Sequence, residues 1–331
     1  MRKMHATGCA VLTGAVMLFV AGPAAASENG ATVYLLGSGG PGNAVMPPVQ
    51  GVFLDNEFYY AHLDANAEKQ FPINGNVIAG LDGDLIADFP TVVVVPTTNF
   101  LGGTLMLGGA IPFGTVMVNA RAKLTGPFGG TRNFSLGDSA TVIGDPIVTG
   151  ALGWKSGNTH FQLSTLANVP IGTYRAGELA NLAFHRWAVD VSGAVSWHQE
   201  AGWDLSAKAG VTFNGRNDVT DYKSGDDFHA EGSIEKKLTK QFSLGLIGYY
   251  YKQISDDTGS GAKLGPFRGE TVGAGGTVAW DFMFTKKTPA TLRVRAFTEF
   301  ETTNRPSNTS VWIGLSLPLS MKLPAGAGGA H

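Results

Sequence analysis

Ionisable side chains fall at alternate positions in several segments of this 331-residue sequence. They are Asp190, Asp204, Lys208, His229, Glu231, Glu235, Asp281, Arg293, Arg295, Glu299 and Glu301. Alternate residues of a β-strand lie on one face, so these groups are predicted to share the polar face of a sheet. Because both signs are present, that face can hold internal ion pairs or line a hydrated path.

Serine and histidine side chains could together support acyl hydrolysis. The histidines after residue 26 are His62, His160, His185, His198, His229 and His331. None lies in a recognisable local signature with a serine, and no G-x-S-x-G turn occurs. We therefore predict no enzyme, and keep a barrel hydrolase of the phospholipase type as an alternative.

Acidic residues also cluster where a metal could bind. Asp218, Asp221, Asp226 and Asp227 lie in or beside one segment, but their spacing is not that of a calcium-binding EF-hand loop. His229, Glu231 and Glu235 share a face, where pairing with Lys208 or an arginine is favoured over metal binding. We expect no metal and no cofactor.

The segment 187–214 shows which kind of element positions these groups. Trp187, Val189 and Val191 alternate with polar residues such as Asp190, and the pattern repeats after residue 202, where Leu205 and its apolar partners alternate with polar side chains. A period of two indicates two strands, each with one apolar face. Such a face can meet a soluble core or lipid.

The N-terminus indicates export. Arg2 and Lys3 precede an apolar stretch at 9–21 and the small residues 24–26, which predicts a secretory signal peptide at 1–26, cleaved after Ala26. The apolar run is shorter than a spanning helix needs, and no later segment is a credible membrane helix. An exported chain of this kind can meet a bilayer only as a closed barrel. The net charge of −2 and the lack of a basic run argue against nucleic acid as a partner.

The alternating pattern predicts strands at 51–62, 85–97, 102–122, 139–154, 158–170, 187–199, 202–214, 226–239, 242–255, 269–284, 288–302 and 309–319. Short connections are expected at 155–157, 200–201, 240–241 and 285–287. Long connections are expected near 63–84, 123–138, 171–186, 215–225 and 256–268. Short periplasmic turns and longer extracellular loops are typical of transmembrane barrels.

Parity sets the strand number. If 102–122 is one strand bulged at Pro112, the barrel has twelve strands and every short turn lies on the periplasmic side. Fourteen strands is the alternative, if the N-terminal lead adds a strand and Pro112 forms a turn. The prediction is an all-β, antiparallel barrel in the outer membrane with a narrow lumen.

Aromatic residues mark the ends of the apolar stripes. They are Trp187, Trp197, Trp203, Phe213, Trp280 and Phe284, and we expect them at the lipid interface. The charged face then points into the lumen. The expected domains are the signal peptide 1–26, a Gly- and Pro-rich lead at 27–50, the barrel at 51–320 and a tail at 321–331. The lead is either a plug inside the barrel or a loose periplasmic tail.

Several motifs resemble a known family, the outer-membrane barrels described as transporters or as proteins of the meta-pathway of phenol degradation, related to the fatty-acid channels. The motifs include Gly144-Asp145-Pro146, the segment 170–174, the segment 220–229 and the segment 248–253, and the resemblance covers about 47–319. One departure is the tail beyond the last strand, which only loosely resembles an assembly signal.

The resemblance implies passive uptake of small hydrophobic or aromatic compounds across the outer membrane. The expected partners are outer-membrane lipid, such a solute and the outer-membrane assembly machinery. A structural or adhesive surface barrel is the remaining alternative.

Overall fold

The computed structural model describes residues 28, 32–73, 76–125, 131–266 and 268–322. No helix within those ranges has the length and apolar character to span a membrane. The strands are β1 (Gly51–Ile73), β2 (Asn76–Phe100), β3 (Gly103–Ala110), β4 (Phe113–Thr125), β5 (Thr131–Ile143), β6 (Ile147–Ser156), β7 (Thr159–Asn168), β8 (Ala188–His198), β9 (Trp203–Asn214), β10 (Arg216–Asn217), β11 (Tyr222–Lys223), β12 (Asp227–Lys237), β13 (Phe242–Gln253), β14 (Glu270–Thr285), β15 (Thr288–Thr303) and β16 (Ser307–Met321).

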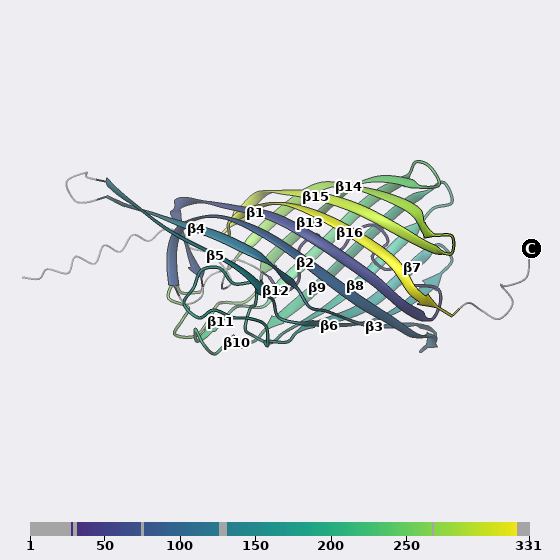
Figure 1. The fold of residues 1–331 in the computed structure, drawn as a ribbon, viewed down its shortest axis with the longest axis horizontal. Helices are drawn as coiled ribbons and strands as arrows, with labels where there is room; N and C mark the ends of the chain where they lie inside the picture. The colour runs from purple at the N-terminus through teal and green to yellow at the C-terminus, as the bar shows by residue number, and fades with distance from the viewer. Residues whose placement is uncertain (1–27, 29–31, 74–75, 126–130, 267, 323–331) are drawn as a thin grey trace, which may run out of the picture.

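Twelve strands close into an antiparallel barrel, as predicted (Figure 1). Their order is β1-β16-β15-β14-β13-β12-β9-β8-β7-β6-β3-β2, and the pairing of β1 with β2 closes the ring. β4 and β5 add to this ring, and β10 and β11 form a small separate ribbon.

Pro112 is a break within one strand path, and the hairpin alternative is wrong. Ala110 of β3 pairs with Thr91 of β2, and Phe113 of β4 pairs with Asp88 of the same strand. β4 therefore continues the direction of β3 past the proline, which lacks the N–H that a continuous ladder needs. The neighbouring β5 and β6 are interrupted beside it, between Ile143 and Ile147.

Short turns and long loops lie at opposite ends of the barrel. The turns at 101–102, 157–158, 199–202, 238–241 and 286–287 lie at the end where β1 begins and β16 finishes. The connections at 169–187, 215–226 and 254–269 lie at the other end, on the left in Figure 1. We call these the turn end and the loop end.

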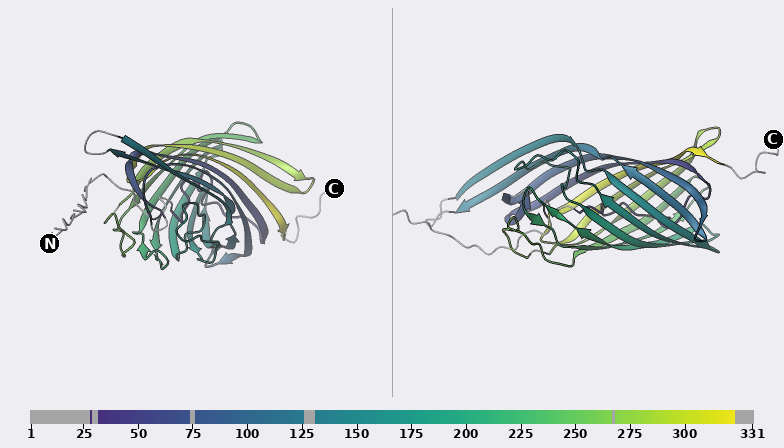
Figure 2. Two further views of the ribbon diagram at one scale, coloured as in Figure 1. Left: turned by 60° about the vertical axis from the view of Figure 1, so that its left-hand side comes forward. Right: turned by 90° about the horizontal axis from the view of Figure 1, so that it is seen from below.

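Two predicted loops are wrong. Where long connections were expected near 63–84 and 123–138, the structure has strands: β1 and β2 pair as far as Ile73 and Asn76, and β4 and β5 as far as Thr125 and Thr131. The hairpin of β4 and β5 projects past the loop end in Figures 1 and 2. These strands exceed the roughly 9–11 residues that cross a bilayer, so a sheet extension stands beyond the membrane.

The two faces of each strand differ as the sequence pattern predicts. On β8, Val189, Val191 and Val195 are exposed on the outside, whereas Asp190 and Ser192 are buried inside. On the projecting sheet the outward face becomes polar, with Arg121 donating to Asp82 (2.9 Å). The apolar outer surface therefore ends below this extension.

Candidate functional site

The N-terminal lead runs through the inside of the barrel. At the loop end, the Glu28 backbone N–H donates to Ser224 Oγ (3.3 Å), and its carboxylate accepts from Asn217 Nδ2 (3.0 Å). At the turn end, the Lys322 N–H donates to the carbonyl of Gln50 (2.9 Å). The described part of the lead, residues 32–50, lies between these two points, and most of its residues are buried or half-buried.

An aromatic contact holds the loop-end half of the lead. The ring of Tyr34 stacks on His229 with 3.6 Å between centroids, and Lys208 Nζ lies 4.8 Å from the same ring. His229 Nε2 in turn lies 2.8 Å from Asp190 Oδ2. Three of the ionisable residues predicted to face the lumen therefore meet around one side chain of the lead.

Charged groups hold the middle of the lead through its backbone. The Gly37 N–H donates to Glu231 Oε1 (2.7 Å), and Arg295 Nη1 donates to the carbonyls of Ser38 (2.6 Å) and Gly39 (2.7 Å). A Cβ at Gly39 would lie 2.2 Å from Glu231 Oε2. An alanine at this position would therefore require the Glu231 carboxylate to shift.

Serines and an aspartate hold the turn-end part of the lead. The Gly42 N–H donates to Ser206 Oγ (2.9 Å) and to Asp204 Oδ1 (3.2 Å). The Ala44 N–H donates to Ser196 Oγ (3.1 Å), and the same hydroxyl faces Asn43 Oδ1 (3.3 Å).

The predicted lumen residues do not all occupy one environment. Most are buried inside the barrel: Asp190, Asp204, His229, Glu231, Glu235, Arg295 and Glu299. Lys208 and Arg293 are half-buried, and Arg293 Nη2 donates to Glu235 Oε1 (3.3 Å). Asp281 lies near the turn end, paired with Lys237 (2.8 Å). Glu301 is exposed, beyond a register shift between β14 and β15.

The predicted interface aromatics lie on the outside of the barrel. Trp187, Trp197, Trp203, Phe213, Trp280 and Phe284 are all exposed. They lie near strand ends on the apolar outer surface, a position that suits rings at a bilayer interface.

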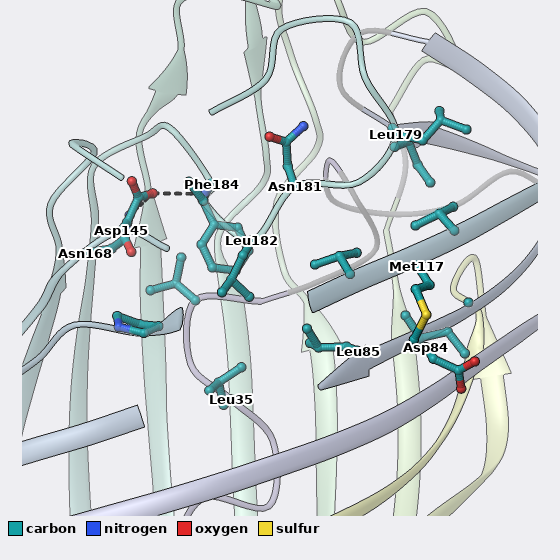
Figure 3. Close-up of a pocket in the computed structure, with 18 of the residues that line it drawn as sticks. Leu35, Asp84, Leu85, Met117, Asp145, Asn168, Leu179, Asn181, Leu182 and Phe184 are labelled. Atoms are coloured by element: carbon teal, nitrogen blue, oxygen red, sulfur yellow. Dashed lines mark hydrogen bonds between the residues drawn. The ribbon is translucent and has the colours of Figure 1, made fainter. Parts of the chain in front are cut away.

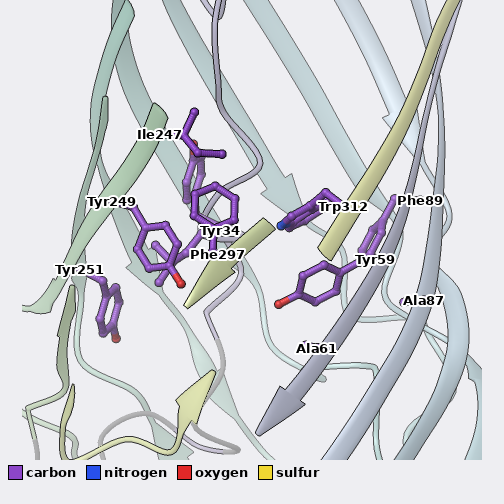
Figure 4. Close-up of a cluster of buried hydrophobic side chains, with 11 residues drawn as sticks. Tyr34, Tyr59, Ala61, Ala87, Phe89, Ile247, Tyr249, Tyr251, Phe297 and Trp312 are labelled. Carbon is purple, nitrogen blue, oxygen red and sulfur yellow. The ribbon is translucent and has the colours of Figure 1, made fainter. Parts of the chain in front are cut away.

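The sequence interpretation missed an aromatic cluster inside the barrel. Tyr34 and Leu36 of the lead pack there with Tyr59, Phe89, Tyr249, Phe297 and Trp312 from the wall (Figure 4). The missed signal was parity: Phe297 lies two residues from Arg295 and from Glu299, so it points inward with them. The lumen is therefore apolar and aromatic on this side as well as charged.

An apolar pocket lies at the loop end, between the projecting sheet, the lead and the 169–187 loop (Figure 3). Its volume is about 120 Å³. The lead contributes Val33 and Leu35, the strands contribute Leu85 and Val116 among others, and the loop contributes Leu179, Leu182 and Phe184. The lead therefore forms part of the pocket wall.

Asp145 fixes the loop over this pocket. Its carboxylate accepts the N–H groups of Gly172 (3.0 Å), Phe184 (2.8 Å) and His185 (2.9 Å), and Asn168 Nδ2 (2.9 Å). A Cβ at Gly172 would lie 2.4 Å from the backbone of Gly144. The Gly144-Asp145-Pro146 motif thus shapes the break between β5 and β6 and anchors the pocket roof.

A second polar cluster encloses the N-terminal end of the lead. Asn217 Nδ2 donates to Tyr174 Oη (3.1 Å), and burial together with the nearby Glu28 carboxylate raises the pKa of Tyr174 to about 12. Burial also raises the pKa of Asp257, although hydrogen bonds from Tyr222 and from the Gly225 N–H (2.8 Å) act in the opposite direction.

The buried Ser192, His229 and Asp190 do not form a hydrolase relay. His229 Nε2 faces both Ser192 Oγ (3.5 Å) and Asp190 Oδ2 (2.8 Å), whereas Nδ1 has no hydrogen-bond partner among the described residues. A serine hydrolase needs its serine and its acid on different ring nitrogens. Within the described ranges, no group of three or more metal-binding side chains occurs either.

A solved outer-membrane channel shares this fold. The COG4313 outer membrane channel from Pseudomonas putida F1 has a TM-score of 0.63 and 18% sequence identity, covering 83% of this chain and 98% of that chain. Two further structures are more distant. A Pseudomonas aeruginosa FadL homologue has a TM-score of 0.41 and 10% identity, covering 84% of this chain and 93% of that chain. The Ralstonia pickettii toluene transporter TbuX has a TM-score of 0.40 and 9% identity, covering 85% of this chain and 92% of that chain. The first similarity supports the outer-membrane barrel fold, and the other two are too distant to add to it.

A search of curated proteins found no match. A family model matches residues 68–315, which is more than half of the chain. The chain therefore belongs to the family described as "Putative MetA-pathway of phenol degradation".

Proposed function

We propose that this barrel is a passive outer-membrane channel for small hydrophobic or aromatic compounds. The observation that carries the proposal is the apolar pocket at the loop end, whose wall includes Val33 and Leu35 of the lead. A concave, mainly apolar site is the usual form of a small-molecule binding site. It lies where a solute arriving from outside would first meet the barrel.

In this proposal the lead is a movable plug. Its contacts with Glu231, Arg295 and Ser196 hold it across the lumen in the state described here. A solute in the pocket touches the lead directly, so binding can favour a state in which the lead is displaced.

A hydrolase is less well supported, because Ser192 and Asp190 both face the same nitrogen of His229. We therefore propose transport without catalysis. The second alternative is an adhesive surface barrel, and no feature of the described loops specifically favours it.

Transport can be tested in cells whose outer membrane slows hydrophobic solutes. Leu182→Trp should fill the pocket, and Leu136→Trp, on the exposed surface of β5, is the matched control. With equal surface amounts of protein, the initial rate of radiolabelled toluene uptake should fall to background for Leu182→Trp alone. Equal rates for both variants would refute a role for the pocket.

A further inference from the structure

The polar side chains around the loop-end pocket are already hydrogen-bonded to the protein. Asp145 accepts hydrogen bonds from three backbone N–H groups and from Asn168. Asn181 accepts from the Arg175 N–H (2.7 Å) and donates to the Arg175 carbonyl (3.0 Å). Asp84 accepts from Tyr60 and lies 3.0 Å from His62 Nδ1.

No polar side chain lining the pocket has a buried atom without a partner, within the part of the chain that the structure describes. The remaining lining is aliphatic or aromatic, including Leu63, Ile73, Leu81 and Val118. A bound solute would therefore meet apolar surface on most sides, and the polar side chains of the lining already hydrogen-bond to the protein.

The pocket volume suits one small ring. At about 120 Å³, it is comparable to a cavity of about 150 Å³ lined by Leu, Ile and Phe, which stays dry and binds benzene. A fused or long-chain solute would need the lead or the loop to move first.

We propose that the pocket selects single-ring hydrocarbons over phenols of the same shape. This inference rests on the proposed transport function and narrows its substrate class. A phenolic hydroxyl loses its water on entry and meets a mainly apolar wall whose polar groups already hydrogen-bond to the protein, whereas the methyl group of toluene loses no hydrogen bond. The penalty corresponds to binding weaker by on the order of ten-fold or more. The description of the family names a phenol pathway, but on this proposal the pocket binds the single-ring hydrocarbon more tightly than the phenol.

The test measures binding of radiolabelled toluene and phenol to the full-length protein in liposomes, with protein-free liposomes of the same lipid subtracted. Val116→Thr adds a hydroxyl to the pocket wall with little change in shape. Val118→Thr does so one position further along the same face and serves if the first variant fails to fold. Val142→Thr is the matched control, since Val142 lies on neighbouring β5 outside the pocket lining.

We expect toluene to bind the unmodified protein more tightly than phenol, and the toluene-to-phenol affinity ratio to fall several-fold in Val116→Thr but not in Val142→Thr. Phenol binding as tight as toluene, or a ratio unchanged in both pocket variants, would overturn the selectivity while leaving transport intact. If neither solute binds the folded protein above the lipid background, the proposed function itself fails.

Discussion

Glu231→Gln should loosen the lead from the barrel wall. Glu231 is buried, and its Oε1 accepts the Gly37 N–H at 2.7 Å. Glutamine keeps the shape and an acceptor oxygen but removes the charge. A hydrogen bond to a charged group contributes about 1.5–3 kcal/mol and a neutral one about 0.5–1.5 kcal/mol, so the docked lead should lose about 1–1.5 kcal/mol. That loss raises the ratio of undocked to docked lead by about five- to twelve-fold.

Single-channel recording in planar bilayers measures this ratio, because an undocked lead leaves a wider lumen and a larger conductance. Glu235→Gln is the matched control: it lies on the same face of β12 but pairs with Arg293 rather than with the lead. The fraction of time in the large-conductance state should rise about five- to twelve-fold for Glu231→Gln relative to this control. Identical traces for the two variants would refute the assigned anchoring role.

Three further perturbations test the packing of the lead, the lipid-facing side of the wall and the loop that contains Asp257. In Gly39→Ala, the added Cβ would lie 2.2 Å from the Glu231 carboxylate, which must then shift away from the Gly37 N–H, so the large-conductance state should become more frequent. Gly40→Ala should leave the conductance unchanged, because its Cβ would meet its nearest neighbour at 3.7 Å. Equal traces for the two variants would contradict this. Val191→Arg, on the outer face of β8, should lower the unfolding free energy in lipid by about 2–4 kcal/mol, and a near-neutral value would argue against a lipid-facing position. Because burial raises the pKa of Asp257, the folded loop binds its proton more tightly than the unfolded chain does. The stability of the loop should therefore rise as the pH falls through this raised pKa toward the ordinary pKa of an aspartate. Limited proteolysis of the loop should show that trend, and Asp257→Asn should abolish it; a pH trend that persists in the variant would contradict the cause given.

The sequence predicts the membrane-spanning part of the fold well because lipid imposes a strict pattern there. Val189 and Val191 must face hydrocarbon while Asp190 between them does not, so alternation reveals both the strand and its orientation. The same constraint made the strand number predictable, since parity left Pro112 as a break within one strand path.

The projecting sheet was not predictable by the same reasoning. Beyond the bilayer, no lipid demands an apolar outer face, so strands such as the far half of β1 lack the stripe of large apolar side chains that identifies a membrane-spanning strand. Their polar outward pairs, such as Asp82 with Arg121, resemble loop composition.

The lead was hard to interpret for a different reason. Val33, Tyr34 and Leu35 sit in a Gly-rich segment without a secondary-structure period, and their roles depend on wall residues far away in the sequence, such as His229. The sequence showed that the charged wall residues share one polar face. It did not show that they bind the backbone of the lead, because backbone hydrogen bonds leave no pattern in the sequence.

Locking the lead in place tests whether the lead must move for transport. Ser196 Oγ on the barrel wall donates to Asn43 Oδ1 of the lead (3.3 Å), and the sequence contains one cysteine, Cys9, in the predicted signal peptide. In Asn43→Cys/Ser196→Cys, an oxidised disulfide should reduce cellular toluene uptake to background, and a reductant should restore it, while each single variant stays insensitive to redox conditions. Toluene uptake that is equally fast with the disulfide formed would contradict a lead that must move for transport.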